Sequence, residues 1–211
     1  MSHIGRAIAS RRATMTSESV QRLIVSIRAH RERFEGFCRS LSGEEMMRPV
    51  PDSTWVVKDF ISHLGTLDTQ LQRWFDGVRE GRLDEATRDA GGRPFDIDKW
   101  NDAEVAQRRG WPLEKVLAEA AANRQRLIAA MERLEDEQIE RTWRFGGDNK
   151  RDPADVPFKM FLMGWARHDP VHVADMLKAL PERAGDAALQ AWLDDPAVKW
   201  YQSAMAGPPR R

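Results

Sequence analysis

Residues 54–77, TWVVKDFISHLGTLDTQLQRWFDG, carry the pattern that decides the fold. Their apolar side chains recur every three or four positions, which is typical of an amphipathic helix. The stripe consists of Val56, Phe60, Leu64, Leu67, Leu71, Trp74 and, just beyond, Val78. We therefore predict a helix from about Trp55 to Gly81 with one long buried face. A face of this length needs partner helices to cover it.

Three further stripes supply those partners. They predict helices at 17–41, 113–135 and 156–180, the third helix of the chain being opened by Pro112 in its first turn. Shorter helices are expected near 100–107 and over 186–206, the latter interrupted at Pro196. No segment shows convincing strand alternation. The fold class predicted is all-α: a four-helix bundle with extra short helices in the long connection 82–111 and at the C-terminus.

Length and composition favour a single domain at 16–206, with a disordered N-terminal tail at 1–15 and a C-terminal tail at 207–211. Lys and Arg number 33 and Asp and Glu number 33, so no basic excess points to a nucleic-acid partner. No stretch approaches the roughly 18 apolar residues of a membrane span, and no secretion signal is recognisable. A single cysteine, Cys38, excludes an internal disulfide and fits a cytoplasmic protein.

Two histidines stand four apart in HDPVHVAD, residues 168–175. His168 and His172 continue the apolar stripe of the predicted helix, and His63 lies in the buried sector of the earlier one. Three imidazoles would then meet inside an apolar bundle, where burial costs free energy unless each ring is hydrogen-bonded or bound. A divalent metal takes three neutral imidazoles and keeps a fourth position open. The residues do not choose among Zn, Ni, Cu and Fe.

A plainer interpretation competes with the metal site. Among five histidines, one pair spaced by four arises by chance roughly one time in ten, and a core histidine is more often just a hydrogen-bonded polar residue. The third histidine, on a separate buried stripe, strengthens the metal hypothesis. His3 lies in the predicted tail, and His30, beside Arg28 and Arg31, is expected on the surface.

The two histidine segments resemble the DinB-like superfamily. Trp55 opens its helix and His63-Leu64 follows eight residues on, while ARHDPVHVADMLKAL, residues 166–180, is similar to the later His-x-x-x-His helix. The resemblance covers about residues 17–180. It implies a four-helix bundle, often a homodimer, with His63, His168 and His172 as the metal ligands. The superfamily includes mycothiol-dependent maleylpyruvate isomerases and bacillithiol transferases, so a low-molecular-weight thiol is implied as a cosubstrate.

Two positions depart from the family pattern. Val56 stands where a capping Ser or Thr is common, so Ser53 or Thr54 is expected to cap the helix instead. Pro170 stands between two ligands and deletes a helical hydrogen bond. We expect a kinked but continuous helix, since the apolar stripe keeps its phase through the proline. The alternative is a helix that restarts at Pro170 and turns His168 away from the site.

The function predicted is that of a metal-dependent transferase, isomerase or hydrolase. It would use a low-molecular-weight thiol or metal-bound water on a small electrophilic substrate. The alternative is a non-catalytic metal-binding or stress-response protein of the same fold. An iron-dependent oxidative sulfur-transfer enzyme ranks last, because such enzymes join a large second domain for which 211 residues leave no room.

Several other residues are candidates for supporting roles. Asp175, Asp169 and Asp68 either orient a ligand imidazole or are solvated surface acids. Arg144 and Lys150 are placed to bind an anionic substrate. Trp143 and Trp165 either wall a pocket or simply pack. Cys38 lies on an apolar stripe and is expected to be a buried small hydrophobe.

Overall fold

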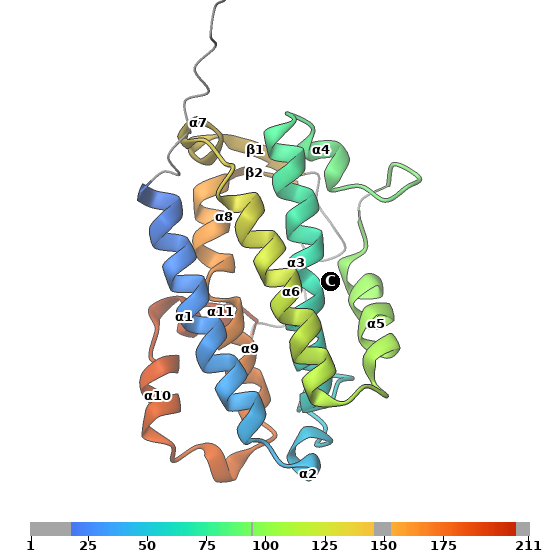
Figure 1. Ribbon diagram of the computed structural model, residues 1–211, viewed down its shortest axis with the longest axis vertical. Coiled ribbons are helices and arrows are strands. Elements are labelled where there is room, and N and C mark those ends of the chain that lie inside the picture. The colour runs from blue at the N-terminus through green and yellow to red at the C-terminus, as the bar shows by residue number, and fades with distance from the viewer. Residues whose placement is uncertain (1–17, 94, 146–152, 206–211) are drawn as a thin grey trace, which may run out of the picture.

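The computed structural model describes residues 18–93, 95–145 and 153–205, so both predicted tails and Lys150 lie outside the described residues. Four helical rods form the bundle (Figure 1). They are α1 (Glu18–Ser40), α3 (Val57–Arg79), α6 (Leu113–Met131) and a fourth rod made of α8 (Phe158–Trp165) and α9 (His168–Leu177). The predicted all-α bundle is confirmed. None of the helices in the described part of the chain is long and apolar enough to cross a membrane.

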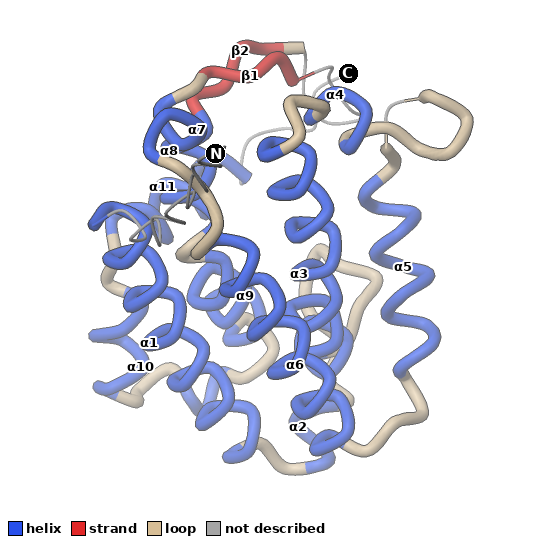
Figure 2. The backbone as a smooth tube through the Cα atoms, turned by 45° about the horizontal axis from the view of Figure 1, so that its top comes forward, coloured by secondary structure: helices blue, strands red, loops and turns tan. Residues whose placement is uncertain are grey.

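Short helices are present in the long connection and in the C-terminal region, as predicted. The long connection contains α4 (Leu83–Ala86) and α5 (Ile97–Arg108), and the C-terminal region contains η1 (Pro181–Arg183), α10 (Ala187–Leu193) and α11 (Pro196–Met205). Two more, α2 (Gly43–Met46) and α7 (Asp136–Glu140), were not predicted. Figure 2 shows α5 running alongside α3, outside the four-helix core. The connection therefore covers one flank of the helix that carries His63.

A short hairpin is present, although no segment shows convincing strand alternation in the sequence. β1 (Thr142–Phe145) and β2 (Ala154–Pro157) form an antiparallel pair in which Trp143 lies opposite Val156. Each strand has four residues, which is too short for an alternating pattern to stand out in the sequence.

The start of α3 also differs from the prediction. Val56 is its N-cap residue, so neither Ser53 nor Thr54 caps the helix. The side chain of Asp59 performs half of a capping box instead, because its Oδ2 accepts a hydrogen bond from the Val56 amide at 3.2 Å. Pro112 likewise occupies the N-cap of α6 rather than its first turn.

Close packing of α3 against α6 fixes the centre of the bundle. A Cβ added at Gly65 would lie 2.8 Å from the Cβ of Ala120, so only glycine lets the two backbones approach this closely. Asn123 on α6 donates a hydrogen bond of 2.9 Å to the Gly65 carbonyl. Apolar clusters lie on both sides of this contact, around Phe34 and Leu64 on one side and Phe75 and Phe158 on the other. His63, two residues before Gly65, is thus held on a rigid part of α3.

Candidate metal centre

Three imidazoles converge inside the bundle, one from α3 and two from α9. One ring nitrogen each of His63, His168 and His172 can be chosen so that all three lie within 4.8 Å of one another. Nε2 of His168 and Nε2 of His172 are 3.0 Å apart. The His63 ring centroid lies 5.3 Å from that of His168 and 5.0 Å from that of His172. The meeting of these side chains, predicted from the helical stripes, is confirmed.

The prediction of a single helix over 156–180 is wrong, because the helix breaks into α8 and α9 before Pro170. α8 ends at Trp165, Ala166 and Arg167 form a turn, and α9 restarts at His168. Pro170 is therefore in the first turn of α9, where its missing N–H needs no partner. Arg167 compensates at the break, since its side chain donates to the Met163 carbonyl at 2.9 Å. The restart keeps His168 and His172 on one face of α9. The alternative, in which a restart turns His168 away from the site, is therefore wrong.

The donor set fits a divalent metal. Imidazole nitrogens bound to one tetrahedral zinc at about 2.0–2.1 Å stand roughly 3.3 Å apart. The Nε2 atoms of His168 and His172 are 3.0 Å apart, and all three ligand atoms lie within 4.8 Å of one another. His63 is 4 % exposed, so its polar ring needs a partner inside the bundle.

Burial favours the neutral form of two of these imidazoles. It lowers the pKa of His63 and the pKa of His168 well below their usual value, and the neighbouring His172 lowers both further. A metal binds the neutral ring, so competition from protons is weak at neutral pH.

Asp175 orients His172, as one of the predicted alternatives holds. Its Oδ2 lies 3.2 Å from Nδ1 of His172, and its Oδ1 accepts from Nζ of Lys178 at 2.7 Å. Burial raises the pKa of Asp175, but these two hydrogen bonds outweigh it and the pKa is lowered. An ionised Asp175 accepts from Nδ1–H and leaves Nε2 of His172 facing the other two rings.

Asp68 and Asp169 form buried ion pairs, which were not predicted. They belong to a buried charge quartet with Arg31 of α1 and Arg124 of α6, all four side chains being less than a tenth exposed. Arg124 contacts Asp68 at 2.6 Å and Asp169 at 3.4 Å, and Arg31 contacts Asp169 at 2.9 Å. Neither acid is a solvated surface residue. The quartet ties all four rods together beside His168.

The N-terminal end of α3 supplies an aromatic wall that the sequence did not reveal. The Trp55 ring lies 5.2 Å from that of His63, and the Phe60 ring lies 5.5 Å from that of His172. Nε1 of Trp55 donates to Asp102 of α5 at 2.8 Å. These contacts place α5 over the His63 side of the cluster.

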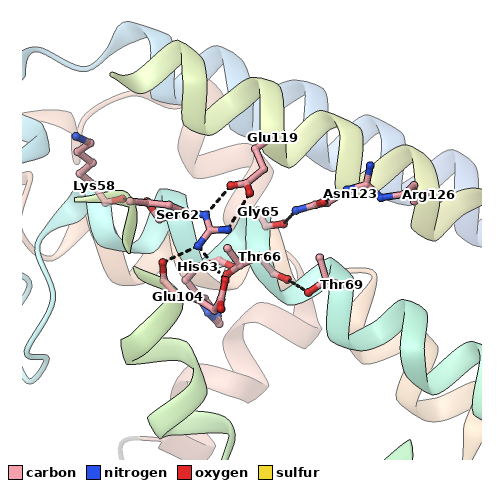
Figure 3. A network of polar contacts seen from close by, with 11 residues as sticks. Lys58, Ser62, His63, Gly65, Thr66, Thr69, Glu104, Glu119, Asn123 and Arg126 are labelled. Atoms are coloured by element: carbon pink, nitrogen blue, oxygen red, sulfur yellow. Dashed lines mark hydrogen bonds and ion pairs between the residues drawn. The ribbon is translucent and has the colours of Figure 1, made fainter. Parts of the chain in front are cut away.

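Charged residues further along α5 anchor it to α6. Figure 3 shows Glu104 of α5 and Glu119 of α6 close to the part of α3 that carries His63. Both accept hydrogen bonds from Arg108, at 2.9 Å and 2.8 Å. The long polar connection is therefore fixed against the bundle at this point.

The sequence profile of one family, described as the mycothiol maleylpyruvate isomerase N-terminal domain, matches residues 27–176. The chain belongs to this family. The matched range contains all three histidines of the cluster, and the family is part of the DinB-like superfamily, so the predicted membership is confirmed.

Two solved structures share the fold of this family member. One is described as the mycothiol-dependent maleylpyruvate isomerase, with a TM-score of 0.56 and 12 % identity, and the match covers 74 % of this chain and 60 % of that one. The other is a histidine-to-alanine mutant of that isomerase, with a TM-score of 0.56, 11 % identity and the same coverage. This chain thus spans about three fifths of their length. No curated protein gives a significant sequence match.

Other predicted residues of this maleylpyruvate isomerase-like domain lie away from the histidines. Arg144 pairs with Asp155 at 3.1 Å on the exposed hairpin, which lies at the end of the bundle where α3 finishes (Figure 1). Trp143 packs against Phe145 and Phe161 rather than the cluster. Arg144 is therefore not placed to bind a substrate at the cluster, and Trp143 does not wall it.

Three further expectations have clear outcomes. Trp165 is buried and its ring lies 5.0 Å from the guanidinium carbon of Arg124, so it packs over the charge quartet. Cys38 is a buried core residue whose pKa is raised by burial, as expected of a small hydrophobe. His30 is half-buried rather than solvated, and its Nδ1 accepts a 2.8 Å hydrogen bond from Trp192.

Proposed function

We propose that His63, His168 and His172 bind one divalent metal ion in a metal-dependent enzyme. The enzyme would act on a small electrophile with a low-molecular-weight thiol as cosubstrate. The observation that carries the proposal is the convergence of three imidazole nitrogens within 4.8 Å inside an apolar bundle. The depressed pKa values of His63 and His168 support it, because neutral rings are the ligand form.

The chemistry that a divalent ion supplies here is a lowered pKa for a thiol or water bound at the position the histidines leave open. The chain's own residues prepare that position. Asp175 fixes the tautomer of His172, and the charge quartet holds the start of α9 in place. Trp55 and Phe60 limit the access of bulk water to the rings, which strengthens electrostatic interactions among the groups inside.

Thiol use is favoured over hydrolysis by the family to which the chain belongs. The family description and the solved neighbour both name mycothiol and a maleylpyruvate isomerase. The transfer of that activity to this chain is part of the proposal, since the chain spans only three fifths of the neighbour. Thiol transfer and thiol-assisted isomerisation share one need, a nucleophilic thiolate in the site.

The test is a thiol-consumption assay with a generic electrophile. Zinc-loaded protein is incubated with monochlorobimane and, in separate reactions, mycothiol, bacillithiol, cysteine or no thiol. We expect faster conjugation with at least one thiol, lost in His63→Ala and kept in His30→Ala. Turnover of an activated ester without any thiol would indicate the hydrolase instead. No acceleration in any reaction by protein that binds zinc would contradict an enzyme of either kind.

A metal-binding protein without catalysis is the second candidate. The burial of the site favours it, because His63 is 4 % exposed and the side chain of His172 only 12 % exposed. A closed three-histidine site would hold a metal for structure or storage. Retention of zinc against a chelator over hours, with no conjugation in the assay above, supports this function.

We further propose a cytoplasmic homodimer. Met160 and Met163 expose apolar side chains one turn apart on α8, and a second copy would cover them. Cys38, a lone buried thiol, suits a reducing compartment. Sedimentation equilibrium at micromolar concentration should give twice the chain mass of 24.2 kDa, and a single species at the chain mass would contradict the dimer.

A further inference from the structure

Two buried polar atoms near the histidine cluster lack hydrogen-bond partners among the described residues. One is Nδ1 of His63 and the other is Oδ1 of Asn101, on α5. Asn101 is 8 % exposed and His63 4 %. A buried acceptor without a donor and a buried ring nitrogen without a partner each cost free energy. The two atoms are chemically complementary, because a neutral imidazole can donate from Nδ1.

The two residues lie on α3 and α5, which run side by side (Figure 2), and neither of the two atoms is hydrogen-bonded within the described part of the chain. The side chain of Asn101 opposes the larger effects of burial and of His172 on the pKa of His63 by raising it. The next residue on α5, Asp102, accepts a 2.8 Å hydrogen bond from Trp55, whose ring packs on His63. Asn101 is thus held on a segment of α5 that packs beside Trp55, which in turn packs on His63.

The other end of α5 is held as firmly. Arg108 joins it to Glu119 of α6, and Nζ of Lys58 on α3 donates to the Arg109 carbonyl at 2.9 Å. Asn101 therefore approaches His63 from a helix fixed at both ends. A residue supported in this way can orient a ring, whereas one on a loose loop cannot.

We propose that Asn101 is a positioning residue that accepts a hydrogen bond from Nδ1–H of His63 and so leaves Nε2 to bind the metal. The inference rests on the proposed metal site. It gives His63 the arrangement that Asp175 gives His172, with an outer partner on Nδ1 and the other nitrogen turned inward. The partner of His63 is a neutral amide, so the ring is oriented without an added negative charge.

The long connection acquires a role under this proposal. Residues 82–111 are not merely a link between α3 and α6, because α5 carries the outer partner of one ligand. A change in α5 would alter the orientation of His63 without touching any of the three rings.

The first arm of the experiment uses the metal-free protein. Long-range proton–nitrogen NMR of ¹⁵N-histidine-labelled protein at pH 8 reports which ring nitrogen carries the proton, with the His63 signals assigned by their loss in His63→Ala. We expect His63 protonated at Nδ1 in wild type and in Asn101→Asp, and a mixture of tautomers in Asn101→Ala. Protonation of His63 at Nε2 in wild type would overturn the proposal.

The second arm measures zinc affinity by competition with a chromophoric chelator. We expect Asn101→Ala to bind about 10- to 100-fold more weakly than wild type, the usual cost of losing an outer partner. Asn101→Asp, which keeps an acceptor oxygen, should restore binding to within about threefold. The exposed Lys99→Ala on the same helix should have no effect. Wild-type affinity in Asn101→Ala, or an Asn101→Asp variant as weak as the alanine, would overturn it.

The two arms separate this inference from the proposed function. If wild type binds no zinc, the metal site fails, while the tautomer of metal-free His63 still decides whether Asn101 orients it. If Asn101→Ala does not fold, the His63 tautomer in wild type and in Asn101→Asp still decides whether Asn101 orients the ring.

Discussion

Nε2 of His168 and Nε2 of His172 lie 3.0 Å apart across one turn of α9. Asp175 accepts a hydrogen bond from Nδ1 of His172, so Nε2 of the neutral ring carries no proton. In the metal-free protein His168 must then donate from its own Nε2. Metal binding at both atoms would require the proton of His168 to move from Nε2 to Nδ1, because the ligand form is the neutral ring. Under the proposed function, the pair is half of the site, and a metal would replace the hydrogen bond between the two rings.

The metal-free protein should lose stability in mild acid. Burial depresses the pKa values of His63 and His168, so the unfolded chain binds more protons than the folded one below the ordinary histidine pKa near 6.5. Stability should fall from about pH 6.5 downward, by at most about 1.4 kcal/mol per pH unit for each histidine. Urea unfolding at pH 8, 6.5 and 5.5 measures it. His63→Phe should show a shallower slope, and equal slopes in both proteins would count against the depressed pKa of His63.

The contact between α3 and α6 should not tolerate a methyl group at Gly65. A Cβ there meets the Cβ of Ala120 at 2.8 Å, so Gly65→Ala should destabilise by about 1–3 kcal/mol. Gly36→Ala on α1 is the matched control, since nothing lies within 4 Å of its added Cβ. Helix propensity alone should make the control more stable by up to about 1 kcal/mol. Chemical denaturation of both variants decides, and similar effects at the two glycines would contradict this packing.

The charge quartet should be costly to break. Arg124→Met leaves Asp68 and Asp169 buried with one cation fewer, and we expect a loss of about 3–5 kcal/mol. Arg144→Met removes the exposed pair with Asp155 and should cost no more than about 1 kcal/mol. Thermal unfolding followed by circular dichroism compares the two. A small effect at Arg124 would mean that the quartet does not hold the rods together.

Helical periodicity predicted the rods and the meeting of the histidines because both depend on spacing within single helices. The same periodicity also places two arginines at buried positions, which we did not use in the prediction. Arg31 falls between Ile27 and Phe34, and Arg124 between Ala120 and Leu127, on the buried faces of their helices. A cation at a core position predicts a buried acid, which is how Asp68 and Asp169 could have been interpreted.

Other features depend on contacts between distant segments, which spacing does not encode. Nothing in the sequence near Asn101 or Trp55 indicates that α5 folds back over His63. The break before His168 was missed because the apolar stripe of the two short helices stays in phase across it. The hairpin was missed because four-residue strands leave almost no pattern.

The central claim is one metal ion per chain, held by three named histidines. The most direct measurement is zinc per chain by elemental analysis, after wild type, His63→Ala, His168→Ala, His172→Ala and His30→Ala have been equilibrated at one buffered free-zinc concentration near the wild-type midpoint. Wild type and His30→Ala should bind equally. Each of the other three should bind at least about tenfold more weakly, since even an outer partner is worth that much. Absence of zinc from wild type, or wild-type binding in all three cluster variants, would contradict the account.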